Sequence, residues 1–186
     1  MNVYTKQHEA VLEQINKTGR YITNNLHVAD DYIGFKEYAL QAYDWLAGHA
    51  PSSENKPDDA DYPIWVSLDE NTIQFPEPGY VIFKLDVDPA RVDRVNINKW
   101  GTMLNLSYIP VDDDDHDAHI RMLNDYGVSD TKAYMTQFYP DIKREIRDSW
   151  ERLFDDSINM GSDACYGIIW EIRKEDIIAI RIGAVG

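Results

Sequence analysis

Hydrophobic periodicity changes from helical to strand spacing and back along this chain, and the order of these changes constrains the fold more than any single motif. Helical spacing predicts a helix that begins at Thr5 and ends at Gly19, and a second helix over residues 30–49. Apolar and polar residues alternate over residues 80–87, as they do in a strand. Helical spacing returns over residues 140–154. Because helices and strands are grouped rather than strictly alternating, we expect an α+β fold of small antiparallel or mixed sheets packed with several helices.

The C-terminal segment predicts a β-hairpin. Two apolar runs, residues 165–173 and 177–182, are separated only by the sequence KED. Such close spacing of two strands is typical of a hairpin. Further upstream, residues 64–68 and 91–98 are expected to form short strands, and a short helix capped by Asn98 is expected to follow them.

Residues 140–154 predict the clearest helix of the chain. Pro140 is well suited to its first turn, because proline lacks the N–H group that this position leaves unpaired. The basic side chains of Lys143, Arg144, Arg147 and Arg152 alternate with Asp and Glu on the face away from the core. We expect ion pairs between neighbouring turns there, each worth a few tenths of a kcal/mol.

Length and charge limit the organisation and the partners of the protein. The chain has 186 residues, of which 44% are hydrophobic, so we expect a single domain over residues 1–186 with a buried core. Its formal net charge is −15, from 33 acidic and 18 basic residues. Nucleic-acid backbones and anionic membranes both bind through Lys and Arg, so neither is an expected direct partner. The acidity fits either plain solubility or imitation of nucleic acid towards a basic protein partner.

Three further features of the sequence predict a cytoplasmic location. Cys165 is the only cysteine, which excludes an intrachain disulfide and suits a reducing compartment. The N-terminal residues lack the basic start and apolar run of a signal peptide. No apolar stretch approaches the ~18 residues that a membrane span requires.

The acidic run DDDDHDAH, residues 112–119, raises the question of a metal site. A calcium-binding loop needs glycine at its sixth position and glutamate at its twelfth. Counted from Asp113, these positions hold Ala118 and Asn124, and counting from Asp112 also fails. We therefore expect no metal site and interpret the run as the solvated start of a helix, where acidic residues are favoured by the helix dipole. A divalent ion bound by the run itself is the alternative.

No nucleophile elbow, phosphate loop, dinucleotide fingerprint or zinc-ligand pair is present, so the five tryptophans are the most informative residues for a ligand site. Core packing accounts for most of them, because large aromatic side chains dominate burial. One or two at the ends of strands could line a flat pocket for a base or another ring.

The order of several segments resembles that of a known protein family. The segments are VYTKQ, YDWL, YPIWVSL, YVIFKLDVDPARV, KWGTMLNLSYIP, IKREIRDSWERLFD and IIWEIRKEDIIAI. Together they resemble a family of uncharacterised, mostly bacterial proteins, domain of unknown function 3841, over nearly the whole chain. The positions that recur in that family are Thr5, Gln7, Trp65, Trp100, Ser149, Trp150, Glu151, Trp170 and Glu171.

At the level of the fold, the chain is also similar to ADP-ribosyltransferase-like domains. The shared features are a short first strand with polar residues, a helix closed by glycine, small split sheets and a late glutamate. This resemblance implies NAD as a candidate cofactor and Glu171 as the catalytic carboxylate. The ligand-binding residues that it implies are Tyr4, Thr5, Gln7, Trp65 and Trp170. The chain departs from those domains in lacking the usual His or Arg on the first strand.

Two functional hypotheses follow, beside the plainer one of a binding module for an unknown ligand. The first is a small-molecule or nucleotide pocket, with ADP-ribosyltransferase-like chemistry, where the N-terminal strand and helix meet the Trp65 and Trp170 strands. The second is a non-catalytic acidic protein that blocks a basic nucleic-acid-binding partner. The ordinary interpretations are that Thr5 is a helix cap and that Glu171 faces solvent on its strand.

Overall fold

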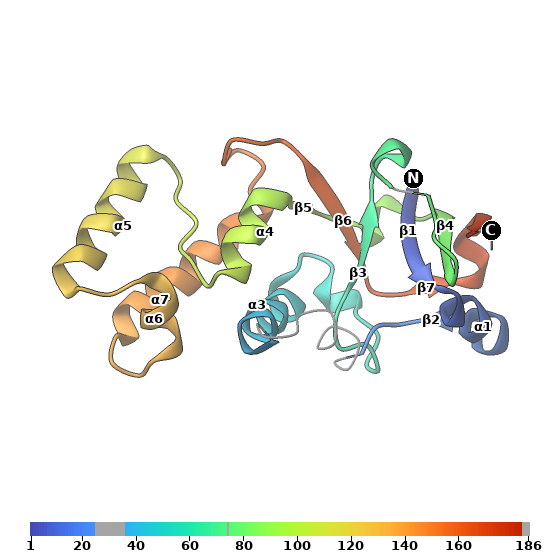
Figure 1. The fold of residues 1–186 in the computed structure, drawn as a ribbon, viewed down its shortest axis with the longest axis horizontal. Helices are drawn as coiled ribbons and strands as arrows, with labels where there is room; N and C mark the ends of the chain where they lie inside the picture. The colour runs from blue at the N-terminus through green and yellow to red at the C-terminus, as the bar shows by residue number, and fades with distance from the viewer. Residues whose placement is uncertain (25–35, 74, 184–186) are drawn as a thin grey trace. The chain divides into compact units, whose positions relative to one another are not determined.

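The computed structural model describes residues 1–24, 36–73 and 75–183. This part of the chain contains six α-helices, a six-stranded sheet and a two-stranded sheet, which confirms the α+β class (Figure 1). The chain divides into two compact units, and each is described separately. The sheet unit comprises Met1–Val28, Ala50–Arg94 and Cys165–Gly186, and the helical unit comprises Ala29–His49 and Val95–Ala164. A single domain over residues 1–186 stays a prediction.

The large sheet has the strand order β5-β6-β3-β1-β4-β8. Its strands are β1 (Asn2–His8), β3 (Ile64–Ser67), β4 (Tyr80–Asp86), β5 (Asp93–Asn96), β6 (Cys165–Ile169) and β8 (Ile177–Ile182). β1 pairs antiparallel with both β3 and β4, while β3 pairs with β6 and β4 pairs with β8. Because β1 has a neighbour on each side, its register is fixed and each of its side chains is held on one face.

The two closely spaced strands expected at the C-terminal end are present as β7 (Ile172–Arg173) and β8, joined by a 3₁₀ turn over Lys174–Asp176. β7 pairs with β2 (Arg20–Tyr21) in the small sheet, and β8 pairs with β4 at the edge of the large sheet. The turn therefore carries the chain from one sheet to the other.

The N-terminal helix begins later than the sequence predicts. Thr5 is not its N-cap, because Thr5 lies within β1 and is held in the ladder with β4. The helix α1 (Glu9–Thr18) begins after His8, whose Nδ1 accepts a hydrogen bond from the N–H of Ala10 (3.2 Å). It ends at Gly19 as predicted, with φ of 85°, a left-handed conformation that glycine adopts without steric cost.

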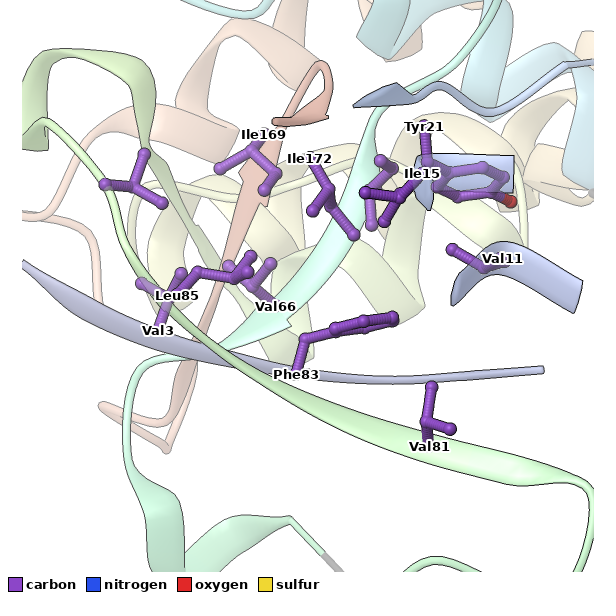
Figure 2. Packing of buried hydrophobic residues seen from close by; sticks show 12 residues of the cluster. Val3, Val11, Ile15, Tyr21, Val66, Val81, Phe83, Leu85, Ile169 and Ile172 are labelled. Carbon is purple, nitrogen blue, oxygen red and sulfur yellow. The ribbon is translucent and has the colours of Figure 1, made fainter. Parts of the chain in front are cut away.

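The core of the sheet unit lies between the large sheet, the small sheet and α1. β1 and β4 contribute Val3 and Phe83, the small sheet contributes Tyr21 and Ile172, and α1 contributes Ile15. Figure 2 shows Phe83 rising from β4 towards the side chains of Ile172 and Ile15. Each of these residues is at most 5% exposed, so burial of apolar surface is the main stabilising term here.

The helical unit is built around Trp150. Its helices are α3 (Lys36–His49), α4 (Ile97–Leu104), α5 (Asp113–Tyr126), α6 (Asp130–Met135) and α7 (Pro140–Ser149), which continues as a 3₁₀-helix over Trp150–Phe154. α6 and α7 lie side by side (Figure 1). The Trp150 ring stacks on Tyr134 at 5.1 Å and meets the edge of Trp45 at 5.9 Å. α7 begins at Pro140, as predicted.

One local prediction in the helical unit needs correction, and part of another falls outside the described residues. α4 is capped by Asn96 rather than Asn98, because the Asn96 Oδ1 accepts hydrogen bonds from the N–H groups of Asn98 and Lys99 (3.0 and 3.2 Å). The start of the predicted second helix, residues 30–35, lies outside the described residues.

No helix in the described parts of the chain is both long and apolar enough to cross a membrane.

Candidate functional site

Three of the residues expected to bind a ligand form one hydrogen-bonded group. Thr5 Oγ1 donates to the backbone carbonyl of Trp65 (2.9 Å), and Gln7 Nε2 donates to Thr5 Oγ1 (2.8 Å). Thr5 is only 3% exposed. The group therefore fastens β1 to β3 within the large sheet.

Strand alternation separates the side chains of this group. Thr5 lies opposite Phe83 in the β1–β4 ladder and shares the core face with it. Trp65 lies between the core residues Ile64 and Val66, so its ring leaves the sheet on the other face. There it meets the ring of Tyr166 edge-on at 6.4 Å. The structure thus joins Thr5 and Trp65 through the Trp65 backbone, while the Trp65 ring and the Thr5 hydroxyl lie on opposite faces.

Tyr4 and Trp170 are both buried and hydrogen-bonded. The Tyr4 hydroxyl donates to Glu70 Oε2 (3.2 Å). The Trp170 Nε1 donates to Ser52 Oγ (2.8 Å), and Ser52 in turn donates to the carboxylate of Asp93. Trp170 is 5% exposed, so most of its ring packs against the protein.

Glu171 lies between two strands rather than within one, because the predicted strand over residues 165–173 is divided into β6 and β7. Both oxygens of its carboxylate have cationic partners. Arg20 Nη1 donates to Oε2 (3.3 Å), and Arg173 Nε donates to Oε1 (2.6 Å). Arg20 and Arg173 face each other across the β2–β7 pair, so the Glu171 carboxylate reduces the repulsion between these two like charges.

Arg91 extends this ion-pair network. Its two Nη atoms each donate to one oxygen of Asp176 at 2.9 Å, and Nη2 also donates to the Glu171 carbonyl (3.3 Å). Arg20 Nη2 donates to Asp59 (2.7 Å). This geometry is that of a structural network in the sheet unit. The assignment of Glu171 and its predicted neighbours to a ligand site stays a prediction.

A pocket of about 420 Å³ lies in the helical unit, along one face of α7 and beside the C-terminal end of α3. It is lined by Trp45, His49, Pro140, Lys143, Arg144, Arg147, Asp148 and Glu151. The α7 residues in this set recur at intervals of three and four, as required for one helix face. The volume is within the range of small-molecule sites.

Three cations gather on this face of α7. The side chains of Lys143 and Arg147 form no salt bridge or hydrogen bond within the described residues, although ion pairs were expected along this face. Lys143 Nζ lies over the Tyr134 ring, 4.7 Å from its centroid. Arg144 pairs with Asp141 (2.7 Å), but both side chains are largely exposed, so water competes for this pair. These cations are available to an anion.

The lining of this pocket also includes an aromatic pair. The His49 imidazole stacks on the Trp45 indole, with ring centroids 4.2 Å apart and an angle of 4° between the planes. Trp45 is buried, while His49 is exposed and is held by a contact between its Nδ1 and the Trp45 carbonyl (2.7 Å). The lining of the pocket therefore combines a flat ring with positive charge.

A second depression, of about 320 Å³, adjoins the first along α7. It is lined by Tyr108, Asp141, Arg144, Glu145, Asp148, Ser149 and Arg152. Arg144 and Asp148 line both depressions. The two depressions thus lie on adjacent faces of α7 and share polar side chains where they meet.

His119 lies behind this second depression and was not predicted as a functional residue. It is 3% exposed, although it belongs to the acidic run that was expected to be solvated. Its Nε2 donates to Asp130 (2.6 Å) and its Nδ1 donates to Glu145 (3.0 Å). Its ring stacks on Tyr108 at 4.1 Å. An imidazole with an ionised carboxylate on each nitrogen donates at both, which requires the protonated form.

The pKa values of this cluster follow from its contacts. Burial alone would lower the pKa of His119, but its hydrogen bonds to Asp130 and Glu145 and their charges outweigh burial and raise it. Burial likewise acts to raise the pKa of Asp115, yet hydrogen bonds from the Val111 N–H and the Tyr108 hydroxyl, with the nearby charge of Arg152, lower it. The cluster therefore favours charged groups at neutral pH.

The acidic run itself starts a helix, as predicted. Asp112 is the N-cap of α5, and its Oδ1 accepts a hydrogen bond from the N–H of Asp115 (2.9 Å). Among the described residues, no group of three or more His, Cys, Asp or Glu side chains is arranged to hold a metal ion.

The candidate site residues that sequence reasoning missed are the α7 cations and His119. The cations were visible as a basic stretch, but their lack of partners was not. His119 stands four residues before the buried Leu123, a spacing that places both on one helix face. That spacing is the one local signal of its burial.

Comparison with known proteins gives one match. The family model described as "Domain of unknown function (DUF3841)" matches residues 2–178, so the chain belongs to that family. No curated protein matches the chain, and no solved structure matches it either.

Proposed function

We propose that this member of the DUF3841 family binds a nucleotide in the pocket between the α7 cations and the Trp45–His49 stack. The observation that carries the proposal is that Lys143 and Arg147 lack ion-pair partners in the described part of a chain with 33 acidic and 18 basic residues. In so acidic a protein, cations that stay unpaired beside a pocket favour an anionic ligand from outside the chain.

Phosphate is the anion that these side chains suit best. Arginine presents a planar fork of donors that matches phosphate oxygens, and lysine adds a compact positive charge. Arg144 and Arg147 lie three residues apart on α7, with Lys143 beside them, so all three reach into the same pocket. A diphosphate or triphosphate offers enough oxygens for the three side chains.

The rest of the pocket suits the other parts of a nucleotide. The exposed face of His49, supported by Trp45, offers a surface on which a base stacks. Asp148 and Glu151 line the same pocket, and carboxylates accept hydrogen bonds from ribose hydroxyls. The two carboxylates also disfavour a ligand that is anionic throughout, so the charge of the ligand must be concentrated at one end.

The test is a titration with ADP and ATP in which binding is measured by thermal shift and by calorimetry. A ligand that binds the folded state raises the melting temperature with concentration. Arg147→Ala is expected to weaken nucleotide binding roughly ten- to hundredfold, because it removes a charge-assisted contact. Arg121→Ala, an exposed residue of α5, makes the same charge change and is expected to leave affinity unchanged. If no nucleotide binds, or if both variants weaken binding equally, the proposal fails.

The transferase-like and nucleic-acid-mimic hypotheses are separable from this proposal. NAD turnover at Glu171 would be lost in Glu171→Gln and retained in Arg147→Ala. The exposed carboxylates of Asp112, Asp113, Asp114 and Asp117 favour the mimic as a second candidate, which would bind a basic protein without any nucleotide. A cytoplasmic location, where nucleotides are abundant, is part of the nucleotide proposal.

A further inference from the structure

We infer that the ligand extends past Arg144 into the second depression, so that the site takes a pyrophosphate-linked ligand with two halves, such as a nucleotide sugar or a dinucleotide. This inference rests on the proposed function and specifies its substrate class. Arg144 and Asp148 line both depressions, so a ligand can pass from one to the other along α7 without leaving the protein surface.

The second depression is built to accept hydrogen bonds rather than to bind phosphate. Its acidic groups, Asp141, Glu145 and Asp148, outnumber its cations, Arg144 and Arg152. A second phosphate group there would face three carboxylates. The phosphates of the ligand therefore belong with the cations of the first pocket, and a hydroxyl-bearing half without negative charge belongs in the second.

Glu145 is the group that recognises this half. Its Oε1 accepts the hydrogen bond from His119, while its Oε2 has no hydrogen-bond or ion-pair partner among the described residues. The side chain is 42% exposed at the depression. One oxygen is thus fixed by the protein, and the other is left to accept a hydroxyl or amide hydrogen from a ligand.

His119 positions this carboxylate. It is held on its other nitrogen by Asp130 and on its ring face by Tyr108, so its orientation is fixed before any ligand arrives. Such support of a binding group by buried neighbours is what gives a site a defined geometry. Ser149 does not compete for the role, because its hydroxyl already donates to the Ile146 carbonyl and accepts from the Ile109 N–H.

The test compares ADP with ADP-ribose and NAD by calorimetry. The wild-type protein is expected to bind ADP-ribose or NAD about tenfold more tightly than ADP, since the second half adds hydrogen bonds to a charged acceptor. Glu145→Gln is expected to remove this advantage. The His119 Nδ1–H requires an acceptor, so the glutamine turns its oxygen to His119 and presents its NH₂ group, a donor, to the ligand. Affinity for ADP is expected to stay the same.

Glu37→Gln is the matched control, because Glu37 is exposed on α3 and the substitution makes the same charge change. It is expected to behave as wild type with all ligands. If ADP binds but ADP-ribose and NAD bind no better, the inference is overturned while the proposed function stands. It is also overturned if Glu145→Gln and Glu37→Gln weaken ADP-ribose binding alike. If neither ADP nor ADP-ribose binds, the proposed function fails and this inference fails with it.

Discussion

Two glutamates, one in each unit, differ in how many of their carboxylate oxygens are already hydrogen-bonded within the protein. Glu171 of the sheet unit has a guanidinium on each of its oxygens. Glu145 of the helical unit gives one oxygen to His119 and keeps the other for solvent. The side chains are chemically identical, and only Glu145 can accept a ligand without first breaking an ion pair. Availability to a ligand is therefore decided by the partners of a residue rather than by its type.

The cations of the two units show the same difference. Arg20, Arg91 and Arg173 are all engaged with carboxylates. Lys143 and Arg147 on α7 have no such partner within the described residues. The sheet unit uses its charges to hold its own strands, and the helical unit leaves some of its charges facing a pocket. Substitutions should therefore affect stability in the first unit and ligand binding in the second.

Phe83→Ala is expected to have the largest effect on stability. Phe83 is fully buried in the core of the sheet unit, and removal of such a side chain costs about 3–5 kcal/mol. Urea unfolding of the variant and of Phe75→Ala, whose parent side chain is 85% exposed, provides the comparison. The control is expected to change the free energy of unfolding by less than about 0.5 kcal/mol.

Hydrogen exchange on the Phe83→Ala variant also tests the prediction of a single domain. If the chain unfolds as one domain, amides of both units lose protection together. Loss of protection confined to the sheet unit would show that the two units unfold separately and would end the single-domain prediction.

Glu171→Gln is expected to have the next largest effect. It keeps the shape of the side chain but removes the charge shared by Arg20 and Arg173, which are partly exposed, so we expect a loss of about 1–2 kcal/mol in unfolding free energy. Nucleotide affinity in the helical unit is expected to stay at the wild-type value. If Glu171→Gln is as stable as wild type but has lost NAD turnover, Glu171 is catalytic rather than structural, and the comparison between the two glutamates is reversed.

His119 predicts a pH dependence that belongs to the helical unit. Its pKa is raised in the folded state, so the stability that it contributes is fully present below its unfolded pKa and is lost as pH rises through its folded pKa. Between about pH 6 and pH 9, the melting temperature of wild type should therefore fall more than that of His119→Gln.

The matched control is His116→Gln, three residues earlier on the same helix, where the parent side chain is exposed. Its pH profile is expected to follow that of wild type. Equal profiles for wild type and His119→Gln would show that the imidazole is not held as a cation between Asp130 and Glu145.

The sequence predicted those parts of the fold that depend on local signals. The α+β class, the end of α1 at Gly19, the start of α7 at Pro140 and the helix start at Asp112 all follow from residues close to one another in the chain. The N-cap at Thr5 was wrong because pairing of β1 with the distant β4 keeps that segment extended. A long-range ladder overrides a local cap signal that is otherwise well suited to a helix start.

The candidate site was less accessible to sequence reasoning for the same physical reason. His119, Asp130 and Glu145 come from three helices, and nothing local to any of them indicates the other two. Likewise, a stretch such as Lys143 to Arg147 is typical of an ordinary ion-paired helix surface. Only the folded arrangement shows which of these charges have no partner.

Asp141→Asn is expected to have the smallest effect on stability and an opposite effect on binding. The Asp141–Arg144 pair is exposed, so its loss, together with that of one acid near the helix start, costs less than about 1 kcal/mol. The substitution also releases Arg144 from a competing carboxylate. Because Arg144 lines both depressions, nucleotide affinity should rise a few fold, as measured by calorimetry.

Asp125→Asn is the control that separates the release of Arg144 from the effect of removing one negative charge. Asp125 is exposed on α5 and carries the same charge as Asp141. Raised salt screens long-range charge effects between exposed groups but acts less on direct contacts. At about 0.3 M salt, Asp141→Asn should still bind nucleotide more tightly than Asp125→Asn. If the two variants bind equally, Arg144 does not touch the ligand. Arg144 would then be no more available to a ligand than the paired arginines of the sheet unit.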